Sequence, residues 1–343
     1  MTAQQDVGYH ARRHGRWHVG EIVFWLLALA CAFLFPSRYL VMTDIVRLAL
    51  FAMSIDLILG YAGIVSLGHA AFFGVGAYSA GLMALHGLVT EPLLALILAG
   101  CAAMLLGFAT SFLVIRGVDL TRLMVTLGIA MLLEALAESF SNITGGTDGL
   151  QGIEMQPILG VFSFDMFGRT GFVYSLIVLF VLFLLARRIV HSPFGLSLRA
   201  IKNNPLRAAA IGIPVNRRLI AIYTVAAFYA GIAGALFTQT TALASLDVFA
   251  FERSADLLLV LIIGGTGYLY GGLIGAVVFS LLEEVFKSIT AEYWQFWIGL
   301  VLVVIVMVGR ARLHRWVLFL PNLLIAQVAG RKSAVALPEG EGQ

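Results

Sequence analysis

Residues 56–78 read Asp56-Leu-Ile-Leu-Gly-Tyr-Ala-Gly-Ile-Val-Ser-Leu-Gly-His-Ala-Ala-Phe-Phe-Gly-Val-Gly-Ala-Tyr78. Apolar residues dominate this stretch, and small residues recur four apart in it and just beyond it, as in the pairs Ala70/Gly74 and Ala77/Gly81. Small residues at this spacing let two helix backbones approach closely inside a bilayer. The stretch therefore predicts closely packed membrane helices, and packing explains it without any contact to a substrate. The same spacing recurs at Ala230/Gly234, Gly231/Ala235 and Gly271/Gly275.

The composition of the whole chain points to the same class. Of the 343 residues, 60% are apolar and 12% are charged, and the mean hydropathy is +0.96. Soluble domains average about 45–50% apolar and about 25% charged residues. At about 20 residues per spanning helix, this length holds roughly ten spans and short loops. The net charge of +3 is spread along the chain, which does not favour nucleic-acid binding.

Apolar stretches bounded by charges, Pro or Gly clusters predict ten spans in an all-α polytopic membrane protein. We expect them near 20–36, 40–59, 64–86, 92–115, 120–140, 171–189, 219–241, 256–269, 272–288 and 294–309. The eighth and ninth are interrupted by glycine clusters at 264–267 and 271–272, which permits a helix broken at membrane depth. The membrane domain then covers 20–309, between tails at 1–19 and 310–343.

Basic residues give the expected orientation, because short cytoplasmic loops retain Lys and Arg. With the N-terminus in the cytoplasm, 17 of the 22 basic residues lie inside. The five outside are Arg38, Arg47, Arg169, Arg253 and Lys287. An even number of spans places both tails in the cytoplasm. Two longer hydrophilic connections then lie on opposite sides, 141–170 outside and 191–218 inside.

Five spans before the outer connection and five after it would have opposite orientations, as in transporters built from inverted repeats. A short sequence echo accompanies this arrangement: Tyr61-Ala-Gly-Ile64 recurs as Tyr229-Ala-Gly-Ile232. Four residues can match by chance, so the prediction of two inverted halves rests on topology.

Polar residues within the spans need an explanation, because a charge at the helix centre costs about 2.5–3.5 kcal/mol on insertion scales. Asp44 and Arg47 are three residues apart, so we expect them to pair on one helix face. Asp56 lies near the cytoplasmic end of its span, within reach of water or of a loop partner. His69 is expected to be a hydrogen-bonded packing residue.

Glu134 and Glu138 share one face of the fifth span in its outer half. This position fits a wet cavity open to the outside, contact with an exterior protein, or an ordinary place at the membrane interface. The sequence leaves these three alternatives open.

We find no pattern for catalysis or for metal binding in the sequence. A P-loop requires Gly-Lys followed by Ser or Thr, and no glycine precedes Lys202, Lys287 or Lys332. Cys31 and Cys101 lie in apolar stretches without the spacing of metal ligands. We therefore expect no enzymatic activity, no metal and no cofactor in this chain, with any ATP bound by partner subunits.

The segment 56–78 resembles the signature of the LivH/LivM family, the permease subunits of branched-chain amino-acid ABC importers. Three further segments agree in order, namely 144–153 (Thr-Gly-Gly-Thr-Asp-Gly-Leu-Gln-Gly-Ile), 192–213 and 259–275. The outer motif and the length are closer to the LivM branch.

The resemblance implies an importer in the bacterial inner membrane. Its components are two homologous permease subunits, two cytoplasmic ATPases and a periplasmic substrate-binding protein. The connection 191–218 would then couple this chain to an ATPase, and the alternative is a merely solvated basic loop. Pro205 divides its amphipathic stretch, 198–207, into two short helical pieces, and Gly212 is expected to end the second one.

The resemblance also nominates individual residues. The expected coupling residues are Arg199, Lys202, Asn204, Pro205, Arg207 and Gly212. The expected translocation path includes Tyr61, Ser66, His69, Phe72, Tyr78 and Glu134. Asn203 and Ala209 depart from the family pattern, since both replace acidic residues, and a salt bridge from these positions to an ATPase cannot be assumed.

The expected substrates are branched-chain or other hydrophobic amino acids, although similar permeases carry urea, short amides or aromatic acids. A second class of function is an ion-coupled secondary transporter that uses intramembrane carboxylates. The candidate acids, Glu134, Glu138, Asp56 and Asp256, lie near span ends, and a carrier does not need the long connection at 191–218. A passive channel would need a filter, which we do not recognise in the sequence.

Overall fold

The computed structural model describes residues 19–165, 167–290 and 292–308, and these residues are mostly helical. The helices are α2 (Val19–Leu34), α3 (Tyr39–Ala62), α4 (Ala70–Leu85), α5 (Pro92–Val114), α6 (Asp119–Ser139), α7 (Ser141–Thr144), α8 (Arg169–Val190), α9 (Pro193–Asn203), α10 (Pro205–Ala210), α11 (Val215–Thr241), α12 (Phe251–Gly264), α13 (Leu269–Ile289) and α14 (Trp294–Val308). Short 3-10 turns occur at η1 (Pro36–Arg38), η2 (Gly146–Asp148) and η3 (Leu246–Phe249). The tails at 1–18 and 309–343 lie outside the described residues.

Six of the described helices are long and apolar enough to cross a membrane. They cover Pro36–Ala62, Pro92–Val114, Leu120–Ser139, Arg169–Val190, Val215–Thr241 and Leu269–Ile289. Shorter apolar helices occur at Gly20–Cys31, Ala70–Leu85 and Trp294–Ile305. The prediction of an all-α polytopic membrane protein is confirmed, and the number of ten spans stays a prediction.

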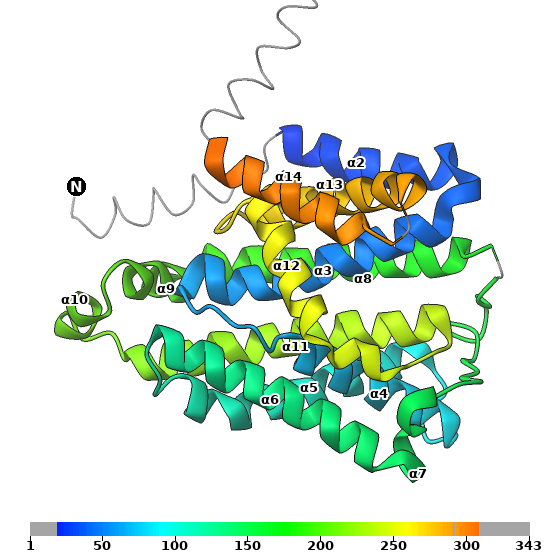
Figure 1. Cartoon of the computed structure of the whole chain (residues 1–343), viewed down its shortest axis with the longest axis horizontal. Coiled ribbons are helices and arrows are strands. Elements are labelled where there is room, and N and C mark those ends of the chain that lie inside the picture. Colours follow the sequence, from blue (N-terminus) through cyan, green and yellow to red (C-terminus); the bar gives the residue numbers. More distant parts are fainter. Residues whose placement is uncertain (1–18, 166, 291, 309–343) are drawn as a thin grey trace, which may run out of the picture. The chain divides into compact units, whose positions relative to one another are not determined.

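The chain divides into two compact units, residues 1–280 and residues 281–343. Within the first unit, α11 packs against α3, α4 and α5 (Figure 1). A Cβ at Gly76 would clash with the carbonyl oxygen of Gly231, and one at Gly234 would clash with that of Phe73. The close approach of helices predicted from small residues is therefore confirmed where α4 meets α11.

The expected span at 64–86 is wrong as a single helix. Gly63 adopts φ +73° at the end of α3, which favours glycine, and the chain then runs without helix until α4 begins at Ala70. Hydropathy does not separate this extended segment from a helix, because both are apolar. The N-terminus of α4 consequently lies inside the first unit.

Side chains from distant helices satisfy the backbone of this extended segment. The N–H of Leu67 donates to Oγ1 of Thr126 at 3.2 Å, and the N–H of Ala70 donates to Oγ of Ser254 at 2.9 Å. Irregular backbone at membrane depth requires such partners, because no water replaces them. Thr126 and Ser254 are both buried.

The glycine cluster at 264–267, which permitted a helix broken within the membrane, lies instead at the end of α12 and in the turn between it and a separate helix, α13. α12 starts five residues earlier than expected, at Phe251, and ends at Gly264. The turn that follows contains Gly265 at φ +107° and Gly267 at φ +82°. A Cβ at Gly264 would clash with the carbonyl oxygen of Gly271, so glycine lets α12 and α13 meet closely.

The sequence echo between the two halves has no common structural setting. Tyr61 lies in the last turn of α3, whereas Tyr229 lies in the interior of α11 and donates to the carbonyl oxygen of Leu182 at 2.9 Å. The match between these four-residue segments therefore carries no evidence for inverted repeats.

Candidate functional sites

The connection 191–218 forms a helical pair, α9 and α10, at one end of the first unit (Figure 1, left). The side chain of Asn204 accepts the N–H of Arg207 at 2.9 Å, and Pro205 occupies the first position of α10. The predicted division at Pro205 is therefore confirmed. Gly212 follows α10 at φ +86°, so its predicted role in ending that helix is also confirmed.

The tip of this pair presents apolar side chains to solvent. Leu206 is 83% exposed and Ile211 is 71% exposed, and Arg207 is exposed between them. The opposite side of α9 is buried at Leu198 and Ile201. An amphipathic pair with apolar residues at its outer tip is suited to docking on another protein.

Two basic residues of α9 point toward α3 rather than away from it. The Nζ of Lys202 donates to the carbonyl oxygen of Gly60 at 2.7 Å. The guanidinium of Arg199 lies 5.3 Å from the centroid of the Tyr61 ring. Both residues were expected as coupling residues, and the structure places both against the last turn of α3.

Asp56 is fully buried one turn before Gly60 in the same helix. Its Oδ1 accepts the backbone N–H of Gly267 at 2.8 Å, so of the two alternatives left open for this side chain, water or a loop partner, the structure shows the loop partner. A Cβ at Gly60 would clash with Oδ1 of Asp56 and with the N–H of Gly267. Glycine at position 60 is thus required for this contact.

A cavity of about 940 Å³ lies beside these contacts. Its lining includes three cations, Arg187, Arg199 and Lys202, together with Tyr61 and Glu21. Arg187 pairs with Glu21 at 2.5 Å. The charged side chains that line the cavity are therefore mostly basic, and α9 and the turn at 265–268 both contribute to its wall.

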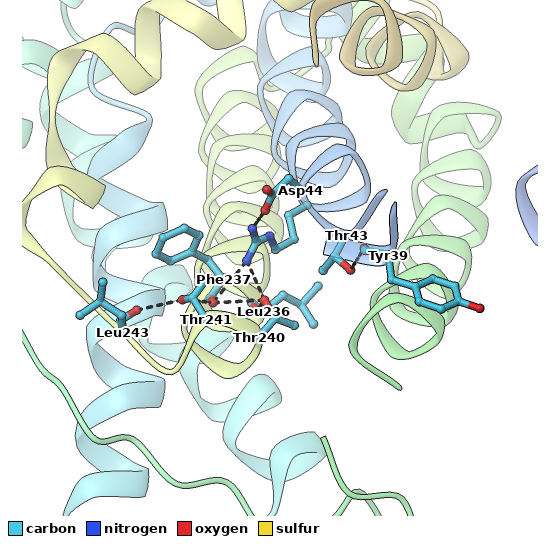
Figure 2. A network of polar contacts seen from close by, with 9 residues as sticks. Tyr39, Thr43, Asp44, Leu236, Phe237, Thr240, Thr241 and Leu243 are labelled. Atoms are coloured by element: carbon cyan, nitrogen blue, oxygen red, sulfur yellow. Dashed lines mark hydrogen bonds and ion pairs between the residues drawn. The ribbon is translucent and has the colours of Figure 1, made fainter. Parts of the chain in front are cut away.

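A second polar cluster is built around Arg47 of α3, whose side chain is buried. Its guanidinium donates to Oγ1 of Thr240 at 2.6 Å and to the carbonyl oxygen of Phe237 at 3.4 Å, and it pairs with Asp44. Figure 2 shows Asp44, Phe237 and Thr240 around this guanidinium. The predicted pairing of Asp44 with Arg47 is confirmed.

Phe237 connects Arg47 to a second arginine. The guanidinium carbon of Arg47 lies 4.9 Å from the centroid of this ring, and that of Arg253 lies 5.3 Å from it. Arg253 also pairs with Asp247 at 2.7 Å. The aromatic face thus reduces the cost of bringing two like charges to one place.

A smaller cavity, of about 370 Å³, opens beside Arg47. Asp44, Arg47 and Asp165 line it, together with the hydroxyl-bearing Thr240 and Thr241. Burial raises the pKa of Asp165, but hydrogen bonds from backbone N–H groups outweigh burial and hold this pKa below its usual range. The cavity is therefore lined by one guanidinium and by the carboxyl groups of two aspartates.

The residues expected along the translocation path are not brought together in either of these two cavities. Tyr61 lines the larger cavity, whereas Ser66, His69, Phe72 and Tyr78 are buried and line neither of the two. Glu134 is half-buried on α6 and lines neither cavity as well.

The predicted packing role of His69 is confirmed, since its Nε2 lies 2.9 Å from Oγ of Ser54. Phe72 packs its edge against His69 and Tyr223, and Tyr78 stacks on Phe249. These aromatic contacts close the space around α4.

Sequence reasoning missed the partners that complete both polar clusters. Gly60 acts through its carbonyl oxygen and Gly267 through its N–H, so neither offers a side chain to recognise. The glycine cluster at 264–267 was the available signal for the second. Thr240 and Arg253 carried no distinctive spacing. Among the described residues, we find no group of three or more His, Cys, Asp or Glu placed to hold a metal ion.

A family model described as a branched-chain amino acid transport system permease component matches residues 38–306. The chain is 27% identical, over 282 residues, to proteins named high-affinity branched-chain amino acid transport system permease protein LivM, from Escherichia coli and from Salmonella typhimurium. Each alignment covers 75% of this chain and 65% of the relative, a little less than two thirds of its length. A probable LivH protein of Methanocaldococcus jannaschii is 29% identical over 154 residues, covering 44% of this chain and 46% of that protein. No solved structure gives a significant match.

Proposed function

Because the chain belongs to the family of branched-chain amino acid transport system permease components, we propose that it is the permease subunit of an ABC importer. It forms the membrane path for branched-chain or other hydrophobic amino acids and contains no ATPase site of its own. Energy comes from two separate cytoplasmic ATPase subunits, and a second homologous permease and a periplasmic binding protein complete the assembly.

The observation that carries this proposal is the α9–α10 pair. It projects from one end of the first unit, and its apolar tip at Leu206 and Ile211 is exposed. An ATPase that docks on this tip can move α9, which is bonded to α3 through Lys202. An ion-coupled carrier has no use for such a projecting pair, so the geometry favours the ABC importer.

The small cavity at Arg47 supports amino acids as the substrate class. The guanidinium of Arg47 can bind the α-carboxylate of an amino acid, and the carboxylates of Asp44 and Asp165 can bind its α-ammonium group. Urea and short amides carry neither charge, and aromatic acids lack the ammonium. The mixed lining thus favours a zwitterion over these alternative substrates.

We further propose ten spans in two inverted halves in the bacterial inner membrane, with both tails and α9–α10 in the cytoplasm. The distribution of basic residues, 17 inside and five outside, supports this orientation. A cysteine at Ser197 is expected to react with an impermeant reagent only from the cytoplasm, and one at the exposed Thr147 only from outside. Labelling of Ser197→Cys by the impermeant reagent in intact cells would contradict the proposed orientation.

Reconstitution tests the function directly. The chain is purified from its native membrane with its associated subunits, and uptake of a labelled hydrophobic amino acid into proteoliposomes is measured with and without ATP. Uptake is expected to require ATP and the ATPase chains. Accumulation by this chain alone under an ion gradient, without nucleotide, would instead establish a secondary transporter.

A further inference from the structure

Three segments that are far apart in the sequence meet at the last turn of α3. Lys202 comes from α9, Gly267 comes from the turn between α12 and α13, and Asp56 and Gly60 belong to α3 itself. The contacts are the Lys202 Nζ to Gly60 carbonyl bond at 2.7 Å and the Gly267 N–H to Asp56 Oδ1 bond at 2.8 Å. One turn of α3 therefore bonds to both of the other segments.

We propose that these two hydrogen bonds form a latch, defined as Asp56, Gly60, Lys202 and Gly267, which makes α9, α3 and the α12–α13 turn move as one piece. Asp56 and Lys202 are the positioning residues of this latch. The proposal rests on the proposed function, because the movement to be transmitted is the one that an ATPase imposes on α9.

Both bonds are of a kind that resists separation. The Lys202 ammonium is the charged donor of one bond, and charge-assisted hydrogen bonds are roughly twice as strong as neutral ones. The other bond is made by a carboxyl group that has no contact with solvent. Asp56 is fully buried, and its Oδ2 has no hydrogen-bond partner among the described residues. Losing the Gly267 contact would leave neither carboxyl oxygen of Asp56 with one of the hydrogen bonds described here, which is costly in a buried place.

The glycines explain why this turn of α3 can serve both neighbours. Any side chain at position 60 would collide with the Asp56 carboxylate and with the backbone of Gly267. A Cβ at Gly63 would lie 3.1 Å from the Lys202 side chain. Because neither glycine has a side chain, the backbone at the end of α3 lies directly against Gly267 and against the Lys202 side chain. The three segments are therefore closely packed and have little room to move relative to one another.

To separate transmission of movement from folding, each latch side chain is replaced in two ways, once by a residue that removes the hydrogen-bonding group and once by a residue that keeps it. Asp56→Leu removes the acceptor, whereas Asp56→Asn keeps an Oδ1 that accepts the Gly267 N–H. Lys202→Met removes the donor on a residue that is exposed overall, whereas Lys202→Arg keeps a cationic donor. Substitution of Arg116 by Met serves as the matched control, because Arg116 is exposed and does not line the cavity beside the latch.

The experiment measures ATP hydrolysis by the intact complex with and without substrate-loaded binding protein. In Asp56→Leu and Lys202→Met, the ratio of the substrate-stimulated rate to the basal rate is expected to fall about tenfold while the subunit composition stays unchanged. The Asn and Arg variants are expected to stay within about threefold of the wild type. Normal stimulation in both Asp56→Leu and Lys202→Met would overturn the latch, and so would failed assembly of Asp56→Leu beside normal stimulation in Lys202→Met.

A distance measurement gives a readout that folding alone would not move. Spin labels at the exposed positions Asn203 and Tyr268 report on α9 and on the α12–α13 turn. The distance between the two labels is expected to stay constant on ATP binding in the otherwise wild-type complex. In Lys202→Met, the distribution of this distance is expected to broaden. A separation that changes with ATP in the wild type would contradict the latch. Failure of the wild-type complex to couple uptake to ATP would instead contradict the proposed function, whichever result the variants give.

Discussion

Where α9 meets α3, side chains bond to backbone atoms of other segments, whereas around Arg47 a guanidinium is held mainly by side chains, a carboxylate, a hydroxyl and an aromatic ring, with one longer bond to a backbone carbonyl at 3.4 Å. The first arrangement depends on glycine, because backbone atoms must come close. The second leaves room for a cavity of about 370 Å³ and exposes 61% of the Asp44 side chain.

This difference separates two tasks. Contacts to backbone atoms have one geometry and no substitute partner, so they hold segments in fixed positions. Side-chain partners such as Asp44 and Thr240 can exchange one contact for another when a ligand arrives. The α9 region is therefore suited to transmitting movement, and the Arg47 region is suited to receiving a charged solute.

The largest effect is expected where a side chain is added to the α9 region. Gly60→Ala places a Cβ against Asp56 and Gly267, and overpacking of this kind costs about 1–3 kcal/mol or more. The purified complex is expected to unfold at a temperature several degrees lower, measured by thermal denaturation. Gly128→Ala is the matched control, because a Cβ there meets nothing within 4 Å. Equal unfolding temperatures in the two variants would show that the α9 region does not depend on glycine at position 60, and would contradict its distinction from the Arg47 region.

The next effect concerns the Arg47 region. Arg47→Met removes the hydrogen bonds to Thr240 and Phe237 and leaves Asp44 without its partner. Hydrogen bonds with a charged group contribute about 1.5–3 kcal/mol, so uptake of a hydrophobic amino acid is expected to fall at least about tenfold. Unlike Gly60→Ala, this variant is expected to keep normal basal ATP hydrolysis. Undiminished uptake at subsaturating substrate would rule out a receiving role for Arg47.

A smaller energetic cost, but one placed in the coupling element itself, is expected at the end of α10. Gly212 has φ +86° and open space around its Cβ position, so a side chain there costs conformational energy of about 1 kcal/mol without a clash. Gly212→Val is expected to abolish substrate-stimulated ATP hydrolysis while the complex still assembles. Gly212→Asn tolerates the left-handed conformation better and is expected to keep most of the stimulation. Normal stimulation in the Val variant would show that α10 does not dock on the ATPase.

The smallest effect is expected at Arg199. Its guanidinium contacts the Tyr61 ring from an exposed position, and such a contact is worth about 0.5–1 kcal/mol. Arg199→Ala is therefore expected to reduce stimulated ATP hydrolysis only a few-fold. A complete loss would place Arg199 in the latch beside Lys202.

Local features of this fold could be predicted from the sequence, because their causes are local. Apolar runs predicted the long helices, and Pro205 predicted the division of the 191–218 connection. The three-residue spacing predicted the Asp44–Arg47 pair. The span at 64–86 failed for a physical reason: an apolar segment inside a bundle can be extended if distant side chains satisfy its backbone.

The contacts of the latch could not be predicted. They join residues 142 and 211 positions apart in the sequence, and in both bonds one partner is a backbone atom. A backbone carbonyl or N–H is present at nearly every position, so no residue type marks it. The same holds for Phe237, whose carbonyl oxygen and ring both serve Arg47.

The extended segment before α4 has a consequence for the order in which the chain is made. Leu67 bonds to a residue 59 positions later, and Ala70 bonds to one 184 positions later. At about 5–20 residues per second, a ribosome needs about 10–40 s to reach Ser254 after Ala70. During that interval the N–H of Ala70 at the start of α4 lacks its final acceptor, Ser254. The start of α4 therefore reaches its final position only after α12 has been synthesised. The insertion of this early segment is therefore completed by one of the last helices to leave the ribosome.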